Sequence, residues 1–250
     1  MSEKSKAAQL KEELFYKPKH IGLTLEDAEA ANADRFAEDY KSFLDFAKTE
    51  RRAALRAIED AKAAGFAEFR RGASYKPGDK IYLCNRGKAA VFAVVGSEPV
   101  GRGVKLLAAH IDSPRLDLKP NPVYEDTELA LFKTHYYGGI KKYQWTAVPL
   151  ALYGVIVKKG GEVLDIALGD RPDEPCFVIT DLLPHLAAEQ NKRTLAEGIK
   201  GEELNILIGS MPFKDDKESE LVKLNILKLL FDKYGVTERD FLTRSEERRV

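Results

Sequence analysis

Apolar residues recur at two different spacings along the chain. Over residues 24–47 and again over residues 49–64 they follow the 3.6-residue period of an α-helix. We therefore expect two helices in this part of the chain. Thr24 and Asp27 form a candidate capping box for the first helix, and Gly65 is a suitable stop for the second.

Beyond these helices the period of the apolar positions shortens to about two, which is typical of β-strands. Short runs rich in Val, Ile, Leu, Phe and Tyr alternate with turns that contain glycine. The expected strands are residues 80–86, 89–96, 104–110, 129–136, 151–158, 162–168, 176–179 and 204–208. Hairpin turns are expected at Gly87 and at residues 159–161. A short helix is expected over residues 183–189 and a longer one over residues 216–234, which Gly235 ends.

This order of elements predicts an α/β protein with two blocks. Residues 1–115 combine helices and strands, whereas residues 116–245 are strand-rich and end in a helix. The chain has 250 residues, of which 44% are hydrophobic, and this is enough for a sizeable core.

Charge and cysteine content exclude several classes of function. The 40 basic and 40 acidic residues give a net charge of zero, so no cationic surface is expected to hold a nucleic acid. Cys84 and Cys176 supply no CxxC spacing, which favours a reducing cytoplasm over a disulfide-bonded secreted protein. No apolar run is long enough for a membrane span, so we expect no membrane partner.

One short stretch carries a pattern typical of metal chemistry. His110 stands at the end of the strand expected over residues 104–110, and Asp112 follows two residues later. A neutral imidazole is a common metal ligand, and a nearby carboxylate can fix its tautomer. The competing interpretation is a structural histidine at a strand end, and the His-x-Asp pattern alone leaves both open.

Three motifs in order extend this pattern. The run AAHIDSPRLDLKP contains His110 and Asp112, HYYGGIKKYQWTAVPL follows, and DLLPHLA comes later with His185. Together they resemble the M18 metalloaminopeptidases, the family that includes aspartyl aminopeptidase. The corresponding positions are His110, Asp112, Ser113, Pro114, Tyr137, Gly138, Gly139, Ile140 and Trp145.

This resemblance implies a specific chemistry. Members of the family remove N-terminal residues from peptides with two divalent metals, usually zinc. The resemblance implies that His110 is a ligand of one metal and that Asp112 is its orienting catalytic partner. His185 is a candidate catalytic residue that reaches a neighbouring subunit's site. The second histidine of the family's pattern is Glu189 here, so a structural role for His185 stays open.

The resemblance also implies an architecture. Residues 1–115 correspond to the N-terminal part of the zinc-aminopeptidase catalytic domain, and residues 116–245 to an inserted strand-rich dimerisation domain. Relatives form dimers that assemble into dodecamers, so we expect a homo-oligomer. The family's remaining metal ligands and general base are not recognisable, and we expect the sequence to be a truncated M18 polypeptide. Glu246 and Glu247 stand in a charged run and are expected to be solvated.

Other interpretations remain for these residues. The chain can instead be a non-catalytic assembly module derived from such a peptidase, active only in subunit association. Gly138 and Gly139 can form a phosphate loop, although a backbone turn that requires glycine fits the surrounding pattern better. Ser113 lacks the Gly-x-Ser-x-Gly setting of a catalytic serine.

Overall fold

The computed structural model describes residues 5–158, 160–215 and 217–242, and the side chain of residue 242 is not described. The chain divides into two compact units, Met1–Phe46 and Ala47–Val250. Because this division does not test where a catalytic and an inserted domain meet, the boundary near residue 115 stays a prediction. Glu246 and Glu247 lie outside the described residues.

The first unit is helical. It contains α1 (Lys6–Leu14), a short 3-10 helix η1 (Ile21–Leu23) and α2 (Asp27–Phe46), and none of these described elements has a buried residue. The expected capping box does not form, since the Thr24 hydroxyl donates to the Ile21 carbonyl oxygen at 3.0 Å at the end of η1. Helix α2 begins at Asp27, whose negative charge suits the positive end of the helix dipole.

The second unit begins with helix α3 (Glu50–Ala63), as the sequence predicts. The Thr49 hydroxyl caps it by accepting from the Arg52 backbone N–H at 3.3 Å, and Gly65 follows it with a left-handed φ of 85°. Helix α3 packs on a sheet of order β1-β2-β3, formed by β1 (Ala67–Glu68), β2 (Lys80–Asn85) and β3 (Ala89–Val94). Strands β2 and β3 are antiparallel, and Gly87 has a φ of 70° in the turn between them, so the first hairpin is confirmed.

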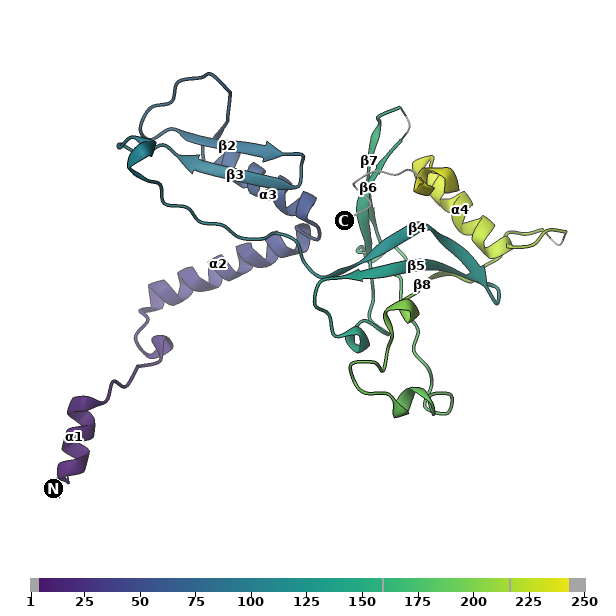
Figure 1. Cartoon of the computed structure of the whole chain (residues 1–250), viewed down its shortest axis with the longest axis horizontal. Helices are drawn as coiled ribbons and strands as arrows, with labels where there is room; N and C mark the ends of the chain where they lie inside the picture. The colour runs from purple at the N-terminus through teal and green to yellow at the C-terminus, as the bar shows by residue number, and fades with distance from the viewer. Residues whose placement is uncertain (1–4, 159, 216, 243–250) are drawn as a thin grey trace. The chain divides into compact units, whose positions relative to one another are not determined.

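The prediction of a strand over residues 104–110 is wrong. Residues 103–114 contain no helix or strand and form a long connection from the 3-10 helix η2 (Val100–Arg102) to β4 (Figure 1). A strand needs a neighbour to satisfy its backbone hydrogen bonds, and none of the described strands pairs with this segment. Its apolar side chains are therefore exposed: Leu106 is 82% and Leu107 is 98% accessible to solvent.

The centre of the second unit is an antiparallel sheet of order β4-β5-β8. It contains β4 (Arg115–Asp126), β5 (Leu129–Tyr137) and β8 (Ile206–Gly209). The sequence pattern did not predict β4, because Pro120 and Pro122 interrupt it and its register shifts between Leu118 and Val123. Such prolines are tolerated because β4 is an edge strand, whose outer N–H groups need no partner in the sheet.

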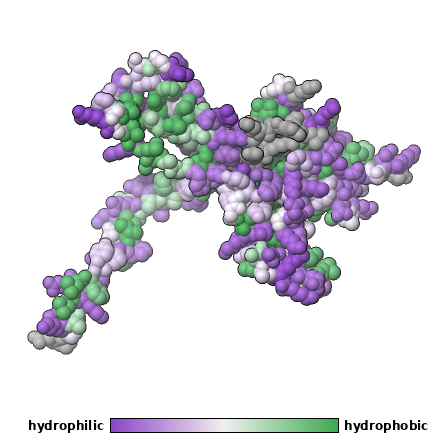
Figure 2. Space-filling model, in the orientation of Figure 1, coloured by the Kyte–Doolittle hydropathy of each residue, from purple (hydrophilic) through white to green (hydrophobic). Residues whose placement is uncertain are grey.

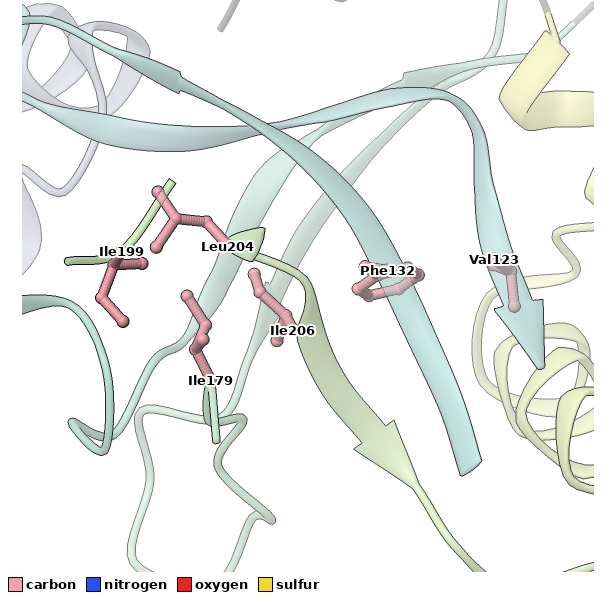
Figure 3. Close-up of a cluster of buried hydrophobic side chains, with 6 residues drawn as sticks. All are labelled: Val123, Phe132, Ile179, Ile199, Leu204 and Ile206. Carbon is pink, nitrogen blue, oxygen red and sulfur yellow. The ribbon is translucent and has the colours of Figure 1, made fainter. Parts of the chain in front are cut away.

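A cluster of buried side chains joins this sheet to the loops beside it (Figure 3). Its members are Val123, Phe132, Ile179, Ile199, Leu204 and Ile206. Trp145 packs against the cluster. The buried Thr134 hydroxyl donates to the Leu204 carbonyl oxygen, which satisfies a polar group inside the core.

The predictions for the remaining elements agree with the structure in part. Strands β6 (Leu152–Val157) and β7 (Val163–Leu168) form the expected second hairpin, although Lys159 in its turn lies outside the described residues. Residues 176–179 form only isolated bridges, at Phe177 and Val178. The other 3-10 helices of the described chain are η3 (Lys142–Gln144), η4 (Gln190–Lys192), η5 (Gly201–Glu203) and η6 (Glu238–Leu242).

The last long helix is α4 (Leu221–Tyr234), which Gly235 ends with a left-handed φ of 63° as predicted. It begins later than the sequence suggests, and Asp216 lies outside the described residues. The helix expected over residues 183–189 is wrong, since this segment forms turns that do not continue as a helix. A single turn gains too few hydrogen bonds to offset the cost of starting a helix. No helix in the described ranges has both the length and the apolar character to cross a bilayer.

Candidate metal-binding site

His110 and Asp112 lie close together near the end of the extended connection, which forms no helix, strand or turn there. The His110 Nδ1 atom lies 3.0 Å from the Asp112 carbonyl oxygen and 3.2 Å from Asp112 Oδ1. With the proton on Nδ1, this nitrogen donates to Asp112 and Nε2 keeps its lone pair. The His110 side chain is 85% exposed, so the imidazole is accessible from solvent.

Asp112 divides its two carboxylate oxygens between two partners. Oδ1 faces His110, and Oδ2 accepts a hydrogen bond of 2.7 Å from the Tyr137 hydroxyl. The hydrogen bond from Tyr137 is the main cause that lowers the pKa of the Asp112 carboxyl, and contacts with its own backbone and with His110 add to it. The same hydrogen bond raises the pKa of the Tyr137 hydroxyl. Asp112 is thus held as a carboxylate beside the imidazole.

Tyr137 is positioned by the first pair of the β4–β5 ladder, in which Arg115 lies opposite Tyr137. The Arg115 guanidinium carbon lies 4.0 Å from the centroid of the Tyr137 ring, and Arg115 Nε donates to Asp117 Oδ1 at 2.7 Å. Burial raises the pKa of the Asp117 carboxyl, against the opposing influence of Arg115.

Gly138 follows Tyr137 with a left-handed φ of 83°. A Cβ at this position would lie 3.4 Å from the Pro114 Cα, so the backbone passes close to the segment that carries Asp112. The prediction of a backbone turn that requires glycine is confirmed at Gly138.

The arrangement fits one ligand of a zinc ion. Metal-ligating histidines usually bond their second ring nitrogen to a carboxylate or a carbonyl oxygen, as His110 does with Asp112. Within the described ranges, no three His, Cys, Asp or Glu side chains gather into a group that could hold a metal ion. The described residues therefore present His110 as a single candidate ligand.

His185 is exposed in a turn that follows Pro184. In the described chain, no hydrogen bond or ion pair joins it to His110 or Asp112, so the structure does not bring the predicted site residues into one cluster. Glu189, the position of the family's second histidine, forms an ion pair with Lys192.

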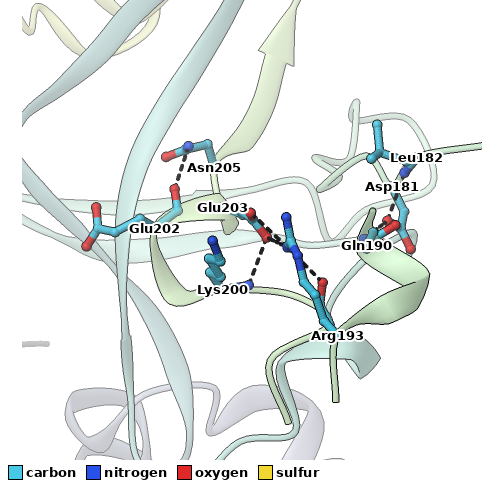
Figure 4. Close-up of polar contacts among 9 residues, drawn as sticks. Asp181, Leu182, Gln190, Arg193, Lys200, Glu202, Glu203 and Asn205 are labelled. Carbon is cyan, nitrogen blue, oxygen red and sulfur yellow. Dashed lines mark hydrogen bonds and ion pairs between the residues drawn. The ribbon is translucent and has the colours of Figure 1, made fainter. Parts of the chain in front are cut away.

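A polar network holds the loop that contains His185 (Figure 4). Asp181 Oδ1 accepts from the Leu182 backbone N–H at 2.8 Å and from Gln190 Nε2 at 2.9 Å. Farther along the loop, Arg193 Nη1 lies 3.0 Å from both carboxylate oxygens of Glu203. These contacts fix the loop while His185 stays accessible.

Comparison with known proteins decides the family. The family described as "Aminopeptidase I zinc metalloprotease (M18)" matches residues 43–245. The chain belongs to the M18 family. This confirms the resemblance carried by the three motifs, and with it a zinc metalloprotease lineage of α/β fold.

Individual M18 relatives agree with this membership. The probable M18 family aminopeptidase 1 of Clostridium acetobutylicum is 46% identical over 226 residues, which is 89% of this chain and 49% of the relative. The crystal structure of the M18 aminopeptidase from Thermotoga maritima has a TM-score of 0.84 at 40% identity and is matched over 91% of this chain and 49% of that one. The chain thus spans about half the length of these relatives.

A more distant solved structure shares the fold only. The S. cerevisiae mApe1 dodecamer matches with a TM-score of 0.56 at 19% identity, over 83% of this chain and 46% of that one.

The M18 motif includes a contact that the sequence did not reveal. Tyr137 and Arg115 were not predicted to act on Asp112, because β4 was not predicted and the pairing of Arg115 with Tyr137 depends on it. The available signal was the Tyr-Gly-Gly motif itself, whose tyrosine hydroxyl contacts the His-x-Asp motif.

Proposed function

We propose that this chain contributes part of the active site of a zinc-dependent aminopeptidase that removes N-terminal residues from peptides. The observation that carries the proposal is the bond between His110 Nδ1 and Asp112, in a chain whose family is described as a zinc metalloprotease. Two divalent metals, when bound, supply Lewis-acid chemistry that polarises the scissile carbonyl and lowers the pKa of the attacking water.

Each predicted site residue has a role in this proposal. His110 presents Nε2 as a metal ligand, while Asp112 holds the imidazole in the tautomer with the proton on Nδ1. His185 donates a hydrogen bond to the developing oxyanion, in the site of a neighbouring subunit. Its exposure on a loop fixed by polar contacts supports that role.

The proposal includes a prediction about the chain by itself. A zinc site needs three or four protein ligands, and His110 alone is presented by the described residues. The purified 250-residue chain is therefore expected not to hydrolyse an aminoacyl substrate. Hydrolysis that chelation and His110→Ala both abolish would contradict this prediction while supporting the assignment of His110.

A chimera tests the assignment more directly. Residues 43–245 of this chain, joined to the rest of the C. acetobutylicum relative, are expected to hydrolyse N-terminal aminoacyl substrates. His110→Ala should lower the activity of the chimera by about a hundredfold or more, because a lost ligand removes the metal site. His135→Ala is the matched control, since His135 is an exposed residue of β5 with no role in the proposed site, and should leave activity unchanged. Equal activity of His110→Ala and His135→Ala would overturn the assignment.

Assembly and location complete the proposal. A homodimer that assembles into a dodecamer is supported by the mApe1 structure, which is described as a dodecamer and shares the fold. A cytoplasmic location is supported by the two cysteines, Cys84 and Cys176, which are both free thiols. A non-catalytic assembly module is the second candidate, favoured by the exposed apolar side chains of residues 104–111.

A further inference from the structure

We propose that Tyr137 is a positioning residue for the metal ligand: its hydroxyl orients the Asp112 carboxylate, which in turn holds His110 with Nε2 available. This inference rests on the proposed function, because it assigns a task to Tyr137 at the same site. Tyr137 acts through Asp112 and makes no contact with the metal in this proposal.

The Asp112 carboxylate divides its two oxygens between two partners. The Tyr137 hydroxyl donates to Asp112 Oδ2 at 2.7 Å, and His110 Nδ1 lies 3.2 Å from Asp112 Oδ1 and 3.0 Å from the Asp112 carbonyl oxygen. A carboxylate that rotates about its Cβ–Cγ bond would exchange or lose the oxygen that faces the imidazole. The hydrogen bond to Oδ2 opposes this rotation, because a charge-assisted hydrogen bond is stronger than one between neutral groups.

The segment that carries His110 and Asp112 has little other support. Residues 103–114 form no helix or strand, so the backbone that carries His110 and Asp112 belongs to no ladder of the described chain. Tyr137, in contrast, ends strand β5 and pairs with Arg115 in the ladder. The ordered strand can therefore fix the Asp112 side chain where the backbone of this segment does not.

Tyr137 is itself held in place. The Arg115 guanidinium lies 4.0 Å from the centre of the Tyr137 ring, where it gains a cation–π attraction. Arg115 is fixed by Asp117 at 2.7 Å, and the two side chains of this ion pair are only 18% and 14% exposed. The ring and its hydroxyl thus have a defined orientation toward Asp112.

A test must separate positioning from a purely structural contribution. A structural hydrogen bond affects the free energy of unfolding but does not change which nitrogen of His110 carries the proton. If Tyr137 positions Asp112, its removal shifts the His110 tautomer. That ratio can be measured from the ring nitrogens by proton–nitrogen NMR, about two pH units above the ordinary histidine pKa so that the ring is neutral.

The experiment compares Tyr137→Phe with the wild-type chain. The ratio of the Nδ1–H to the Nε2–H tautomer of His110 is expected to fall by about threefold or more, as for the loss of one hydrogen bond. Tyr124→Phe is the matched control, since it removes a tyrosine hydroxyl farther along the same β4–β5 ladder, and should leave the ratio unchanged. An unchanged ratio in Tyr137→Phe would overturn the proposal.

A double-mutant cycle tests whether Tyr137 acts through the Asp112 carboxylate. Asp112→Asn should shift the tautomer ratio by itself, and adding Tyr137→Phe should cause no further shift, because Tyr137 acts through the carboxylate. Additive shifts in the double variant would overturn the proposal. If Tyr137→Phe unfolds, Arg115→Gln tests the same chain of contacts, with a fall in the ratio expected and an unchanged ratio counting against it.

Titration with Zn²⁺ separates this inference from the proposed function. In the chimera described above, which supplies the other ligands, the His110 ring signals are expected to shift on addition of Zn²⁺, and Tyr137→Phe should weaken the apparent affinity by about tenfold, as for other residues that orient a metal ligand. A tautomer shift without any Zn²⁺ response at His110 would contradict the proposed function and leave the positioning role intact. A Zn²⁺ response of equal affinity in both proteins would contradict the positioning role alone.

Discussion

Two regions of the second unit have similar apolar sequences but different burial. The cluster of the β4-β5-β8 sheet buries Leu204 completely, at 0% exposed, whereas Leu107 in the extended connection is 98% exposed. The strands around Leu204 pair with one another, and the described chain provides no strand that pairs with residues 103–114. An apolar sequence in these regions is therefore buried only where its backbone forms hydrogen bonds with a neighbouring strand.

The same contrast appears in the β2–β3 hairpin. Helix α3 packs against the face of the hairpin that contains Tyr82, which is only 7% exposed. Leu83 and Val91 point to the opposite face and are 44% and 58% exposed. Figure 2 shows hydrophobic surface over this hairpin.

The candidate site joins the two kinds of region. His110 and Asp112 lie on the unpaired connection, and Tyr137 lies at the end of a paired strand. The hydrogen bond from Tyr137 to Asp112 therefore joins a strand of the sheet to a segment that pairs with none of the described strands.

The largest expected effect is a difference in the free energy of unfolding between substitutions in the two regions. Leu204→Ala should lower the free energy of unfolding by about 2–5 kcal/mol, because it leaves a cavity in a packed core. Leu107→Ala should change it by less than about 0.5 kcal/mol, because the side chain is already in solvent. Urea unfolding followed by the fluorescence of Trp145, which packs on the cluster, measures both values. Similar losses for the two variants would break the comparison.

A smaller effect is expected from a polar group inside the cluster. Thr134→Val keeps the shape of the side chain but removes the donor to the Leu204 carbonyl oxygen, which should cost about 1–3 kcal/mol. The same unfolding assay measures this change. Thr127→Val, at an exposed position between β4 and β5, is the control and should have little effect; equal losses would show that the buried hydrogen bond contributes nothing.

The two glycines that follow β5 are expected to differ in their tolerance of substitution. Gly138→Ala should cost about 1–2 kcal/mol, because a side chain is disfavoured at a φ of 83° and its Cβ approaches Pro114. Gly139→Ala adds a Cβ with nothing within 4 Å and should be nearly neutral. Thermal unfolding of both variants measures the difference, and a neutral Gly138→Ala would argue against the close approach of the two segments.

The smallest effect concerns pH in the packed region. Burial, with a further contribution from the hydrogen bond to Asp170, raises the pKa of Tyr153 to about 12 from 10.0. Because the folded-state pKa is raised, Tyr153 contributes stability that is fully present below pH 10.0 and is lost as the pH rises through about 12. Spectrophotometric titration of tyrosinate should show that Tyr153→Phe removes a late-titrating group. Loss of an early-titrating group instead would contradict the raised pKa of this hydroxyl.

Sequence periodicity predicted the elements that are stabilised locally. Helix α3 was predicted because its apolar residues follow the helical period and Gly65 marks its end, and the β2–β3 hairpin because Gly87 marks its turn. Strand β4 was not predicted, because its prolines interrupt the alternating pattern that indicates a strand, and because its pairing depends on β5. The strand over residues 104–110 was predicted wrongly, since periodicity reports the apolar pattern but not the presence of a partner.

The candidate site shows the same limit. The His-x-Asp motif indicated His110 and Asp112, because the residue types and spacing are sufficient to suggest a ligand and its orienting carboxylate. The contact with Tyr137 depends on the register that places Arg115 opposite Tyr137, and no local pattern reports such a register. His185 was proposed from a motif, and its position on an exposed loop leaves its role as a proposal.

The most direct test of the central claim is to locate zinc by its anomalous scattering in crystals of the chimera that joins residues 43–245 of this chain to the rest of the C. acetobutylicum relative. We predict a zinc peak about 2.0–2.1 Å from His110 Nε2, with Nδ1 still bonded to Asp112. A peak at Nδ1, or zinc bound without His110 as a ligand, would contradict the assignment of His110 as the metal ligand.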